Sequence, residues 1–212
     1  MPSRPDLRIV PLTPDRLVDL AARFEQGGDP KWCWCAYYRV RSFDFSKGGR
    51  TRHRSVLESA VMDGAVEGRA PGLVAYDGEE AVGWISIGPR EDYERLAHSR
   101  VLAPVDESPV WSIVCFVVGR RSRGRGIARA LLAAGIAYAR EHGAATLEAY
   151  PVEVPDGGRI PSANVYRGTL SMFEEAGFDL VARRQAPGSD TTRPIVRLRL
   201  TRATSEFLTA PG

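Results

Sequence analysis

The 212-residue sequence lacks the features of a membrane-spanning or disulfide-stabilised protein. No apolar run approaches the roughly 20 residues that a helix needs to cross a bilayer. The N-terminal segment MPSRPDLRIV has no long apolar stretch typical of a signal peptide. Only three cysteines are present, two of them one residue apart, and they do not have the spacing of a disulfide framework. We therefore expect a soluble, cytoplasmic protein without a membrane partner.

The net charge is also small, because 29 Lys and Arg residues are nearly balanced by 26 Asp and Glu residues, which leaves only +3. That excess is too small to indicate a nucleic-acid-binding protein. The basic residues do concentrate in one stretch, RRSRGRGIAR at 120–129, but it has no aromatic residue on which a base would stack. We expect a local anion site there and no nucleic-acid partner.

Hydrophobic patterning, in a sequence without repeats, predicts both strands and helices. Strands are expected at 7–10, 73–76, 81–87, 111–118, 146–150, 179–184 and 195–200, and helices at 14–26, 55–67, 127–140 and 165–176. The apolar strand 111–118 is expected at the centre of the sheet, parallel to 146–150 through the helix between them. The predicted fold class is α/β, a mixed sheet of six to seven strands with helices on both faces. A single domain is expected over 1–212, with its core at about 7–200 and a tail at 201–212.

The junction between the strand 111–118 and the helix 127–140 has the composition of a phosphate-binding turn. A helix N-terminus presents N–H groups without intrahelical partners and a partial positive charge. Gly124 and Gly126 remove side-chain bulk, so that an anion can approach the backbone. A Walker loop requires Gly-Lys-Ser/Thr, which is absent, and a dinucleotide fingerprint requires a third glycine where Arg129 stands. The pattern that remains is R-x-x-G-x-A at 123–128.

This pattern, with a strand before it and a long helix after it, resembles motif A of the GNAT family of acyl-CoA-dependent N-acyltransferases. The segment YRGTLSMFEEAGF at 166–178 resembles the family's motif B. The resemblance covers roughly residues 7–200. It implies a GNAT-like fold, acetyl-CoA as the acyl donor and no metal. It also implies an acetyltransferase, monomeric or homodimeric, that acts on the amine of a small molecule by direct attack in a ternary complex.

The resemblance further implies which residues contact the cofactor. In the family the backbone of the central strand pairs with the pantetheine arm, a position that Phe116, Val117 and Val118 hold in this sequence. The pyrophosphate is expected on the N–H groups of Arg123, Gly124, Arg125, Gly126, Ile127 and Ala128, with charge from Arg129 and Arg121 and a contact from Asn164. The strands are expected to splay near Val118 and Thr146 and to leave a wedge for the thioester.

The catalytic residues match the family less well. The family often has a tyrosine acid four residues before the glycine of motif B, where this sequence has Phe173. Tyr166, two turns earlier on the same predicted helical face, is the candidate proton donor, with packing or a cofactor contact as the alternative. The central strand lacks the usual glutamate, so Glu148 on the next strand is the candidate general base, and a salt-bridged strand residue is the alternative. Further candidates are Glu153, Asp106 and Glu107.

The remaining motifs concern cysteines and the acceptor. Cys115 is interpreted as packing rather than as a nucleophile, and Cys33, Cys35 and His53 supply too few ligands for structural zinc. The acceptor site is expected among 31–47, 89–109 and 152–162, although the aromatic stretch WCWCAYYR can also be packing against the sheet. The alternative to an enzyme is a CoA-binding sensor or scaffold module without turnover. Thiol release in the presence of amines separates the two.

Overall fold

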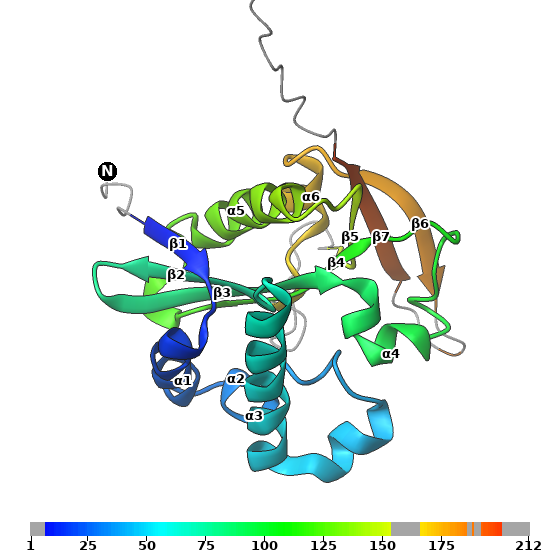
Figure 1. Ribbon diagram of the computed structural model, residues 1–212. Coiled ribbons are helices and arrows are strands. Elements are labelled where there is room, and N and C mark those ends of the chain that lie inside the picture. The colour runs from blue at the N-terminus through cyan, green and yellow to red at the C-terminus, as the bar shows by residue number, and fades with distance from the viewer. Residues whose placement is uncertain (1–6, 154–165, 186–187, 189–191, 201–212) are drawn as a thin grey trace, which may run out of the picture.

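The computed structural model describes residues 7–153, 166–185, 188 and 192–200. Seven strands in these residues form one sheet in the order β1-β2-β3-β4-β5-β7-β6 (Figure 1). They are β1 (Leu7–Pro11), β2 (Gly72–Asp77), β3 (Glu80–Pro89), β4 (Trp111–Val118), β5 (Thr146–Ala149), β6 (Asp179–Gln185) and β7 (Thr192–Arg199). All neighbouring strands are antiparallel except β4 and β5, which are parallel. The predicted mixed sheet, with β4 at its centre, is confirmed.

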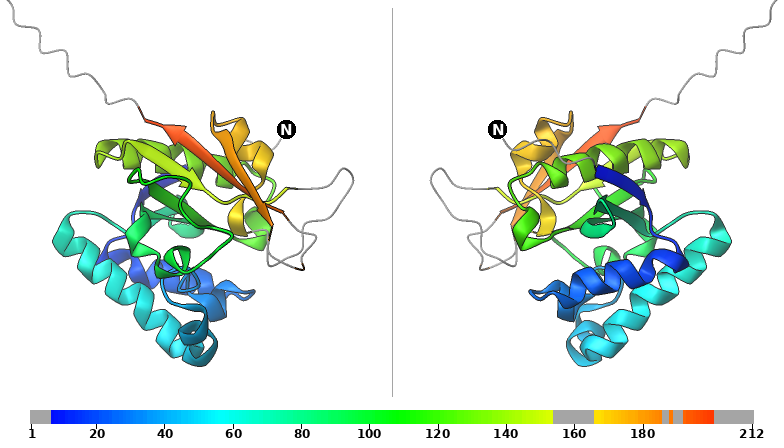
Figure 2. Two further views of the ribbon diagram at one scale, coloured as in Figure 1. Left: turned by 90° about the vertical axis from the view of Figure 1, so that its right-hand side faces the viewer. Right: turned by 90° about the vertical axis from the view of Figure 1, so that its left-hand side faces the viewer.

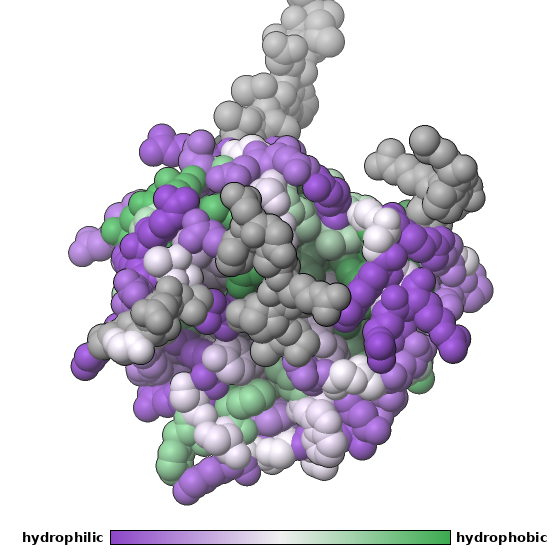
Figure 3. All heavy atoms as spheres, turned by 180° about the vertical axis from the view of Figure 1, so that it is seen from behind, coloured by the Kyte–Doolittle hydropathy of each residue, from purple (hydrophilic) through white to green (hydrophobic). Residues whose placement is uncertain are grey.

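Helices cover both faces of this sheet (Figures 1 and 2). One face carries α1 (Leu17–Glu25), α2 (Pro30–Cys33) and α3 (Ser42–Glu67), and the other carries α5 (Ile127–Glu141) and α6 (Leu170–Glu174). The short α4 (Glu94–Ala97) follows β3, and 3-10 turns lie at Pro14–Arg16, Arg90–Asp92 and Arg120–Ser122. No helix among the described residues is long and apolar enough to span a membrane. Figure 3 shows mainly hydrophilic side chains on the side opposite to the view of Figure 1, with hydrophobic ones between them.

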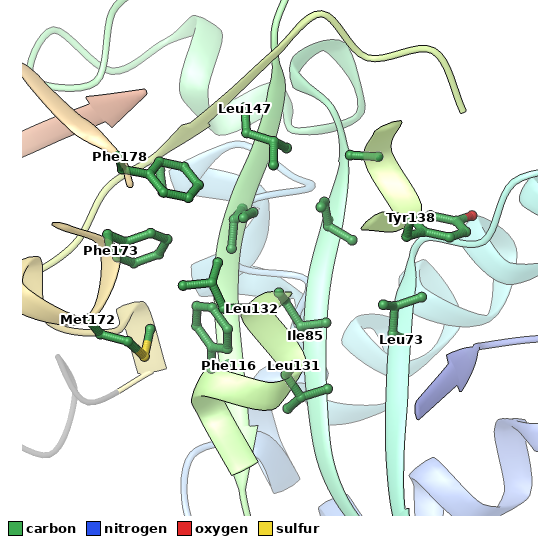
Figure 4. Packing of buried hydrophobic residues seen from close by; sticks show 14 of the residues in the cluster. Leu73, Ile85, Phe116, Leu131, Leu132, Tyr138, Leu147, Met172, Phe173 and Phe178 are labelled. Atoms are coloured by element: carbon green, nitrogen blue, oxygen red, sulfur yellow. The ribbon is translucent and has the colours of Figure 1, made fainter. Parts of the chain in front are cut away.

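The two faces of the sheet have separate cores. On the α5 side, Leu131 and Leu132 pack on Ile85 and Phe116, and Phe173 of α6 packs beside Phe116 with ring centroids 6.0 Å apart (Figure 4). This cluster buries the apolar stripe of α5 against the centre of the sheet.

On the opposite face, Trp34 and Trp84 are fully buried, and the rings of Trp34 and Phe24 form a T-shaped pair with centroids 5.4 Å apart. The packing alternative for the aromatic stretch therefore holds for Trp34, whereas Trp32 is 64% exposed.

Two helices differ from the sequence prediction. The helix expected at 55–67 begins at Ser42 and runs across a kink at Gly49, where the backbone is not helical (φ 67°, ψ 173°). The helix expected at 165–176 is only α6, because Gly168 has a φ of +76° and Thr169 caps the helix by accepting from the Met172 N–H. The expectation that Tyr166 and Phe173 share a helical face is therefore wrong.

The central strand diverges from its parallel neighbour halfway along its length. β4 pairs with β5 only through residues 111–113. Its register against β3 passes from Ile113 to Cys115, so Val114 is a bulge, which bends a strand. Residues 114–118 thus have β3 on one side and, among the described residues, no strand on the other. The strands therefore separate towards Val118, as the sequence analysis expected, whereas Thr146 lies at the end of β5 that stays beside β4.

Candidate active site

A cleft of about 260 Å³ opens where β4 ends and α5 begins. Phe116 and Val118 form its strand wall, and the turn before α5 forms a second wall. The third wall comes from Gly168, Thr169 and Met172, at the start of α6, which sequence analysis did not assign to the site. We call this space the cofactor cleft. The end of the central strand, the N-terminus of α5 and the motif B segment all meet in it.

The glycines of the turn explain its shape. Gly124 and Gly126 have φ of 74° and 78°, a conformation that costs other residues about 1–2 kcal/mol. A Cβ atom on either glycine would meet no atom within 4 Å, so the space beside them is open. The helical bonding of α5 begins with the Ala130 N–H on the Gly126 carbonyl, which leaves the N–H groups of 127–129 without helical partners. Open space, free N–H groups and a helix N-terminus together fit a phosphate group.

Some of the side chains expected near the cofactor line the cleft, and others point away from it. Arg125 turns away from the cleft to pair with Asp77 at 2.8 Å, and Val117 faces the opposite side of β4. Arg129 reaches the cleft while paired with Glu175. The expected residues that line the cleft are Phe116, Val118, Arg123, Gly124, Gly126, Ile127, Ala128 and Arg129. Asn164 lies outside the described residues.

A second cavity, of about 290 Å³, lies on the other face of β4. Val114, Cys115 and Val117 contribute from the strand, and the segment from Asp29 to Phe45 contributes most of the rest. This is part of the region 31–47 in which the acceptor was expected. We call this space the acceptor cavity.

Tyr166 lines both the cofactor cleft and the acceptor cavity. Its hydroxyl lies beside Gly28, where a Cβ atom would come within 3.4 Å of it. Burial and the nearby charge of Asp29 raise the pKa of Tyr166, so the phenol stays protonated at neutral pH. The residue therefore brings a protonated phenol to the wall that the two spaces share.

Glu148, the candidate base, lies in neither space and is fully buried. Its Oε1 accepts from Arg90 at 2.8 Å and from the Tyr150 hydroxyl at 2.6 Å, and its Oε2 accepts from Arg197 at 2.8 Å. A carboxylate held on both oxygens by guanidinium groups is poorly suited to take a proton from an amine. The geometry fits the salt-bridged alternative instead.

The other acidic candidates also lie away from the two spaces. Hydrogen bonds from Arg197 and Ser108 hold the pKa of Asp106 at about 2, and Thr192 and Arg183 lower the pKa of Glu153. Glu107 is exposed on the connection between β3 and β4.

Asp29, which sequence analysis missed, is the only carboxylate among the described residues that line either space. Its position at the N-cap of α2, before Pro30, was a signal in the sequence for a helix start but not for a site.

The three cysteines converge on the acceptor cavity. Cys35 Sγ lies 3.7 Å from Cys115 Sγ and accepts a hydrogen bond from the Trp84 indole at 3.1 Å. Contact with Cys35 and burial raise the pKa of Cys115 well above its usual value, so it is a poor nucleophile. His53 instead contacts the carbonyl groups of Trp32 and Phe45. In the part of the chain that the structure describes, no three metal-ligating side chains come together.

The sequence match decides the family. The model of the acetyltransferase (GNAT) family matches residues 33–167, well over half of the chain. The chain belongs to the GNAT family. It is therefore an acetyltransferase. No curated protein matches the chain.

Solved GNAT structures share the fold of this GNAT protein. An acetyltransferase from Streptococcus pneumoniae is 13% identical (TM-score 0.52), with 92% of this chain and 100% of that chain covered. An agmatine N-acetyltransferase variant in its apo form is 12% identical (TM-score 0.55; 92% and 100% covered). A NatC complex bound to Gag peptide and CoA is 12% identical (TM-score 0.52; 92% and 99% covered).

Proposed function

We propose that the protein moves an acetyl group from acetyl-CoA to the amine of a small molecule, with both substrates bound at once. The observation that carries the proposal is the pair of spaces on opposite faces of the free part of β4, with Tyr166 in the wall of both. The cofactor cleft has a glycine turn at a helix N-terminus, which suits a pyrophosphate. The acceptor cavity is lined mainly by apolar and aromatic side chains, as small-molecule sites are.

On the donor side, acetyl-CoA supplies an activated thioester. The N–H groups of residues 123–128 receive its pyrophosphate, and the guanidinium groups of Arg123 and Arg129 add positive charge at the cleft. The backbone of residues 116–118, on the free edge of β4, pairs with the pantetheine amides. Asn164 stays a predicted contact.

On the acceptor side, Asp29 attracts the ammonium group and accepts its proton through water. The neutral amine then attacks the thioester carbonyl, so that a C–N bond forms as the C–S bond breaks, and the surplus proton of the attacking nitrogen passes to the thiolate to give the amide and free CoA thiol. Tyr166 donates a hydrogen bond to the departing sulfur. The chain's largest contribution is to hold the amine and the thioester together across the free edge of β4. This direct route needs no metal.

We also propose that the protein works in the cytoplasm, as a monomer or homodimer. The three cysteines are free, and the sulfur atoms of Cys35 and Cys115 are in contact without a bond. Such a pair is typical of a reducing compartment.

The first test is thermal unfolding with acetyl-CoA, NAD or ATP. A ligand at about a hundred times its dissociation constant stabilises a protein by roughly 2.7 kcal/mol, which is several degrees in Tm. Stabilisation by acetyl-CoA alone supports the proposal, and no stabilisation by acetyl-CoA contradicts it. Release of free CoA thiol in a panel of amines then separates an enzyme that acetylates small molecules from a CoA sensor.

A further inference from the structure

A basic cavity of about 360 Å³ adjoins the acceptor cavity. Tyr37, Tyr38 and Arg167 line both spaces, so the two share a wall. The basic cavity is also lined by Arg95 and Arg193, and its described lining residues include no Asp or Glu. Positive charge is therefore concentrated beside the place where the acceptor is proposed to bind.

None of these three arginines pairs with a described carboxylate, and Arg95 donates instead to the Tyr37 carbonyl and the Ser42 hydroxyl. Arg90 and Arg197 both pair with Glu148, whereas no described carboxylate pairs with Arg167 or Arg193. Arg167 and Arg193 are half-buried and close enough to affect each other. Burial, and then the charge of Arg167, lower the pKa of Arg193. An anion between the two would relieve this repulsion.

The hydroxyl of Tyr38 points to the same conclusion. Tyr38 is only 6% exposed, and its hydroxyl has no hydrogen-bond partner among the described residues. Burial raises the pKa of Tyr38 to about 12 although the charges of Arg167 and Arg193 act against the rise. The phenol is thus a protonated donor within electrostatic reach of both guanidinium groups. A buried polar group without a partner is costly, so a bound acceptor of hydrogen bonds would stabilise this arrangement.

We propose that the substrate that receives the acetyl group carries an anionic group, a carboxylate or a phosphate, which Arg167, Arg193 and Tyr38 bind. This inference rests on the proposed function, because it concerns the substrate of the same acetyl transfer. Two guanidinium groups and a protonated phenol all have hydrogen bonds to donate, which matches an oxyanion, and the two guanidinium charges repel a second cation. With Asp29 drawing the ammonium group, the site selects a molecule that has both an amine and an acid.

The test uses pairs of amines that differ in charge. Amino acids are compared with their carboxamides, and phosphoethanolamine with ethanolamine, in acetyl-CoA-dependent thiol release and in thermal unfolding with CoA bound. We expect the acidic member of at least one pair to be acetylated with a kcat/KM at least tenfold higher and to raise Tm further. The pair that shows the preference distinguishes a carboxylate from a phosphate.

Variants then assign the preference to the basic cavity. Arg167→Gln and Arg193→Gln are expected to abolish the preference for the acidic amine by raising its KM, with kcat changed less. Tyr38→Phe is expected to reduce this preference severalfold. Arg199→Gln, an exposed residue of the same strand as Arg193, is the matched control and keeps it. CoA-induced stabilisation of each variant shows that it is folded.

Neutral members that react as well as their acidic partners would overturn the inference. So would acidic members that neither react nor stabilise a protein that acetyl-CoA still stabilises. A protein that acetyl-CoA does not stabilise at all would instead overturn the proposed function, and the inference with it.

Discussion

The first three residues of β4 and the last five have different roles, and we call them its paired half and its free half. Residues 111–113 are hydrogen-bonded to strands on both sides and lie next to a buried charge network, in which Ser112 contacts the Tyr150 hydroxyl that also bonds Glu148. Residues 114–118 have one paired edge and one open edge, and the cofactor cleft and the acceptor cavity lie on their two faces. A single bulge at Val114 separates a half that holds the sheet together from a half that leaves its backbone available.

The largest effect is expected beside the paired half of β4, from Glu148→Gln in β5, where Glu148 lies opposite Ser112. The substitution leaves Arg90 and Arg197, whose side chains are 11% and 12% exposed, without their shared counter-charge. Breaking a buried ion pair in this way typically costs about 3–5 kcal/mol of unfolding free energy, and we expect the low end because Arg197 keeps Asp106. Urea unfolding at neutral pH measures the loss.

Glu153→Gln is the matched control for this change. Glu153 also pairs with an arginine, Arg183, but their side chains are 34% and 50% exposed, so its loss should cost at most about 1 kcal/mol. If Glu148→Gln unfolds like the original protein yet loses turnover, Glu148 is a catalytic base and the division of β4 into two halves is wrong.

The second effect is expected in the free half, from Gly126→Glu. The new carboxylate would stand at the N-terminus of α5, where the pyrophosphate is proposed to bind, and repel it. We expect CoA affinity, measured by calorimetry, to fall more than a hundredfold.

Gly143→Glu separates this repulsion from backbone strain. Gly143 follows the other end of α5 with a φ of 76°, and a Cβ atom there also meets nothing within 4 Å. Both variants therefore carry a similar strain of about 1–2 kcal/mol, but only Gly126→Glu should weaken CoA binding. Equal CoA affinities in the two variants would show that the pyrophosphate does not bind at this turn.

The cofactor cleft could be predicted because most of it is built from one continuous stretch. The strand, the glycine turn and the helix follow one another within residues 111–141, and a glycine turn at a helix start has a direct physical meaning. The acceptor cavity has no such signal. It brings residues 29–45 against β4 and Arg167, and its wall includes Cys35. Cys35 and the buried Trp34 before it have φ values of 51° and 46°, which follow from tertiary packing rather than from any local pattern.

The motif B segment shows that a local signal can also be missed. The helical period through 165–176 predicted one helix, but Gly168 followed by Thr169 is a glycine next to an N-cap residue. Because Gly168 and Thr169 start a new helix between them, Tyr166 and Phe173 do not share a helical face as predicted. The error matters for mechanism because Tyr166 lies outside α6, in the wall between the two spaces.

The third prediction concerns the acceptor side of the free half. Asp29→Asn keeps the size and the N-cap character of the side chain but removes the only carboxylate among the described residues that line the two spaces. We expect kcat/KM for the amine to fall about ten- to a hundredfold, with CoA affinity unchanged, because a proton acceptor for the ammonium group is lost. Asp63→Asn, on the exposed side of α3, is the control. An unchanged kcat/KM in the Asp29 variant would show that solvent, and not Asp29, takes the proton from the ammonium group.

The smallest effect is expected where the two faces of the free half meet, from Tyr166→Phe. The phenyl ring keeps the wall between the cofactor cleft and the acceptor cavity, and only the hydroxyl is lost. We expect turnover to fall less than tenfold, because a thiol is far more acidic than an alcohol and a thiolate can leave without a dedicated acid. Tyr76→Phe, which removes a hydroxyl bonded to Asp19 outside both spaces, controls for the loss of a phenol. A loss of turnover above a thousandfold, with CoA affinity unchanged, would instead show that Tyr166 is the catalytic acid, a role that the side chain of the core residue Phe173 cannot have. Catalysis would then depend mainly on one side chain rather than on the positioning of both substrates at the open edge of β4.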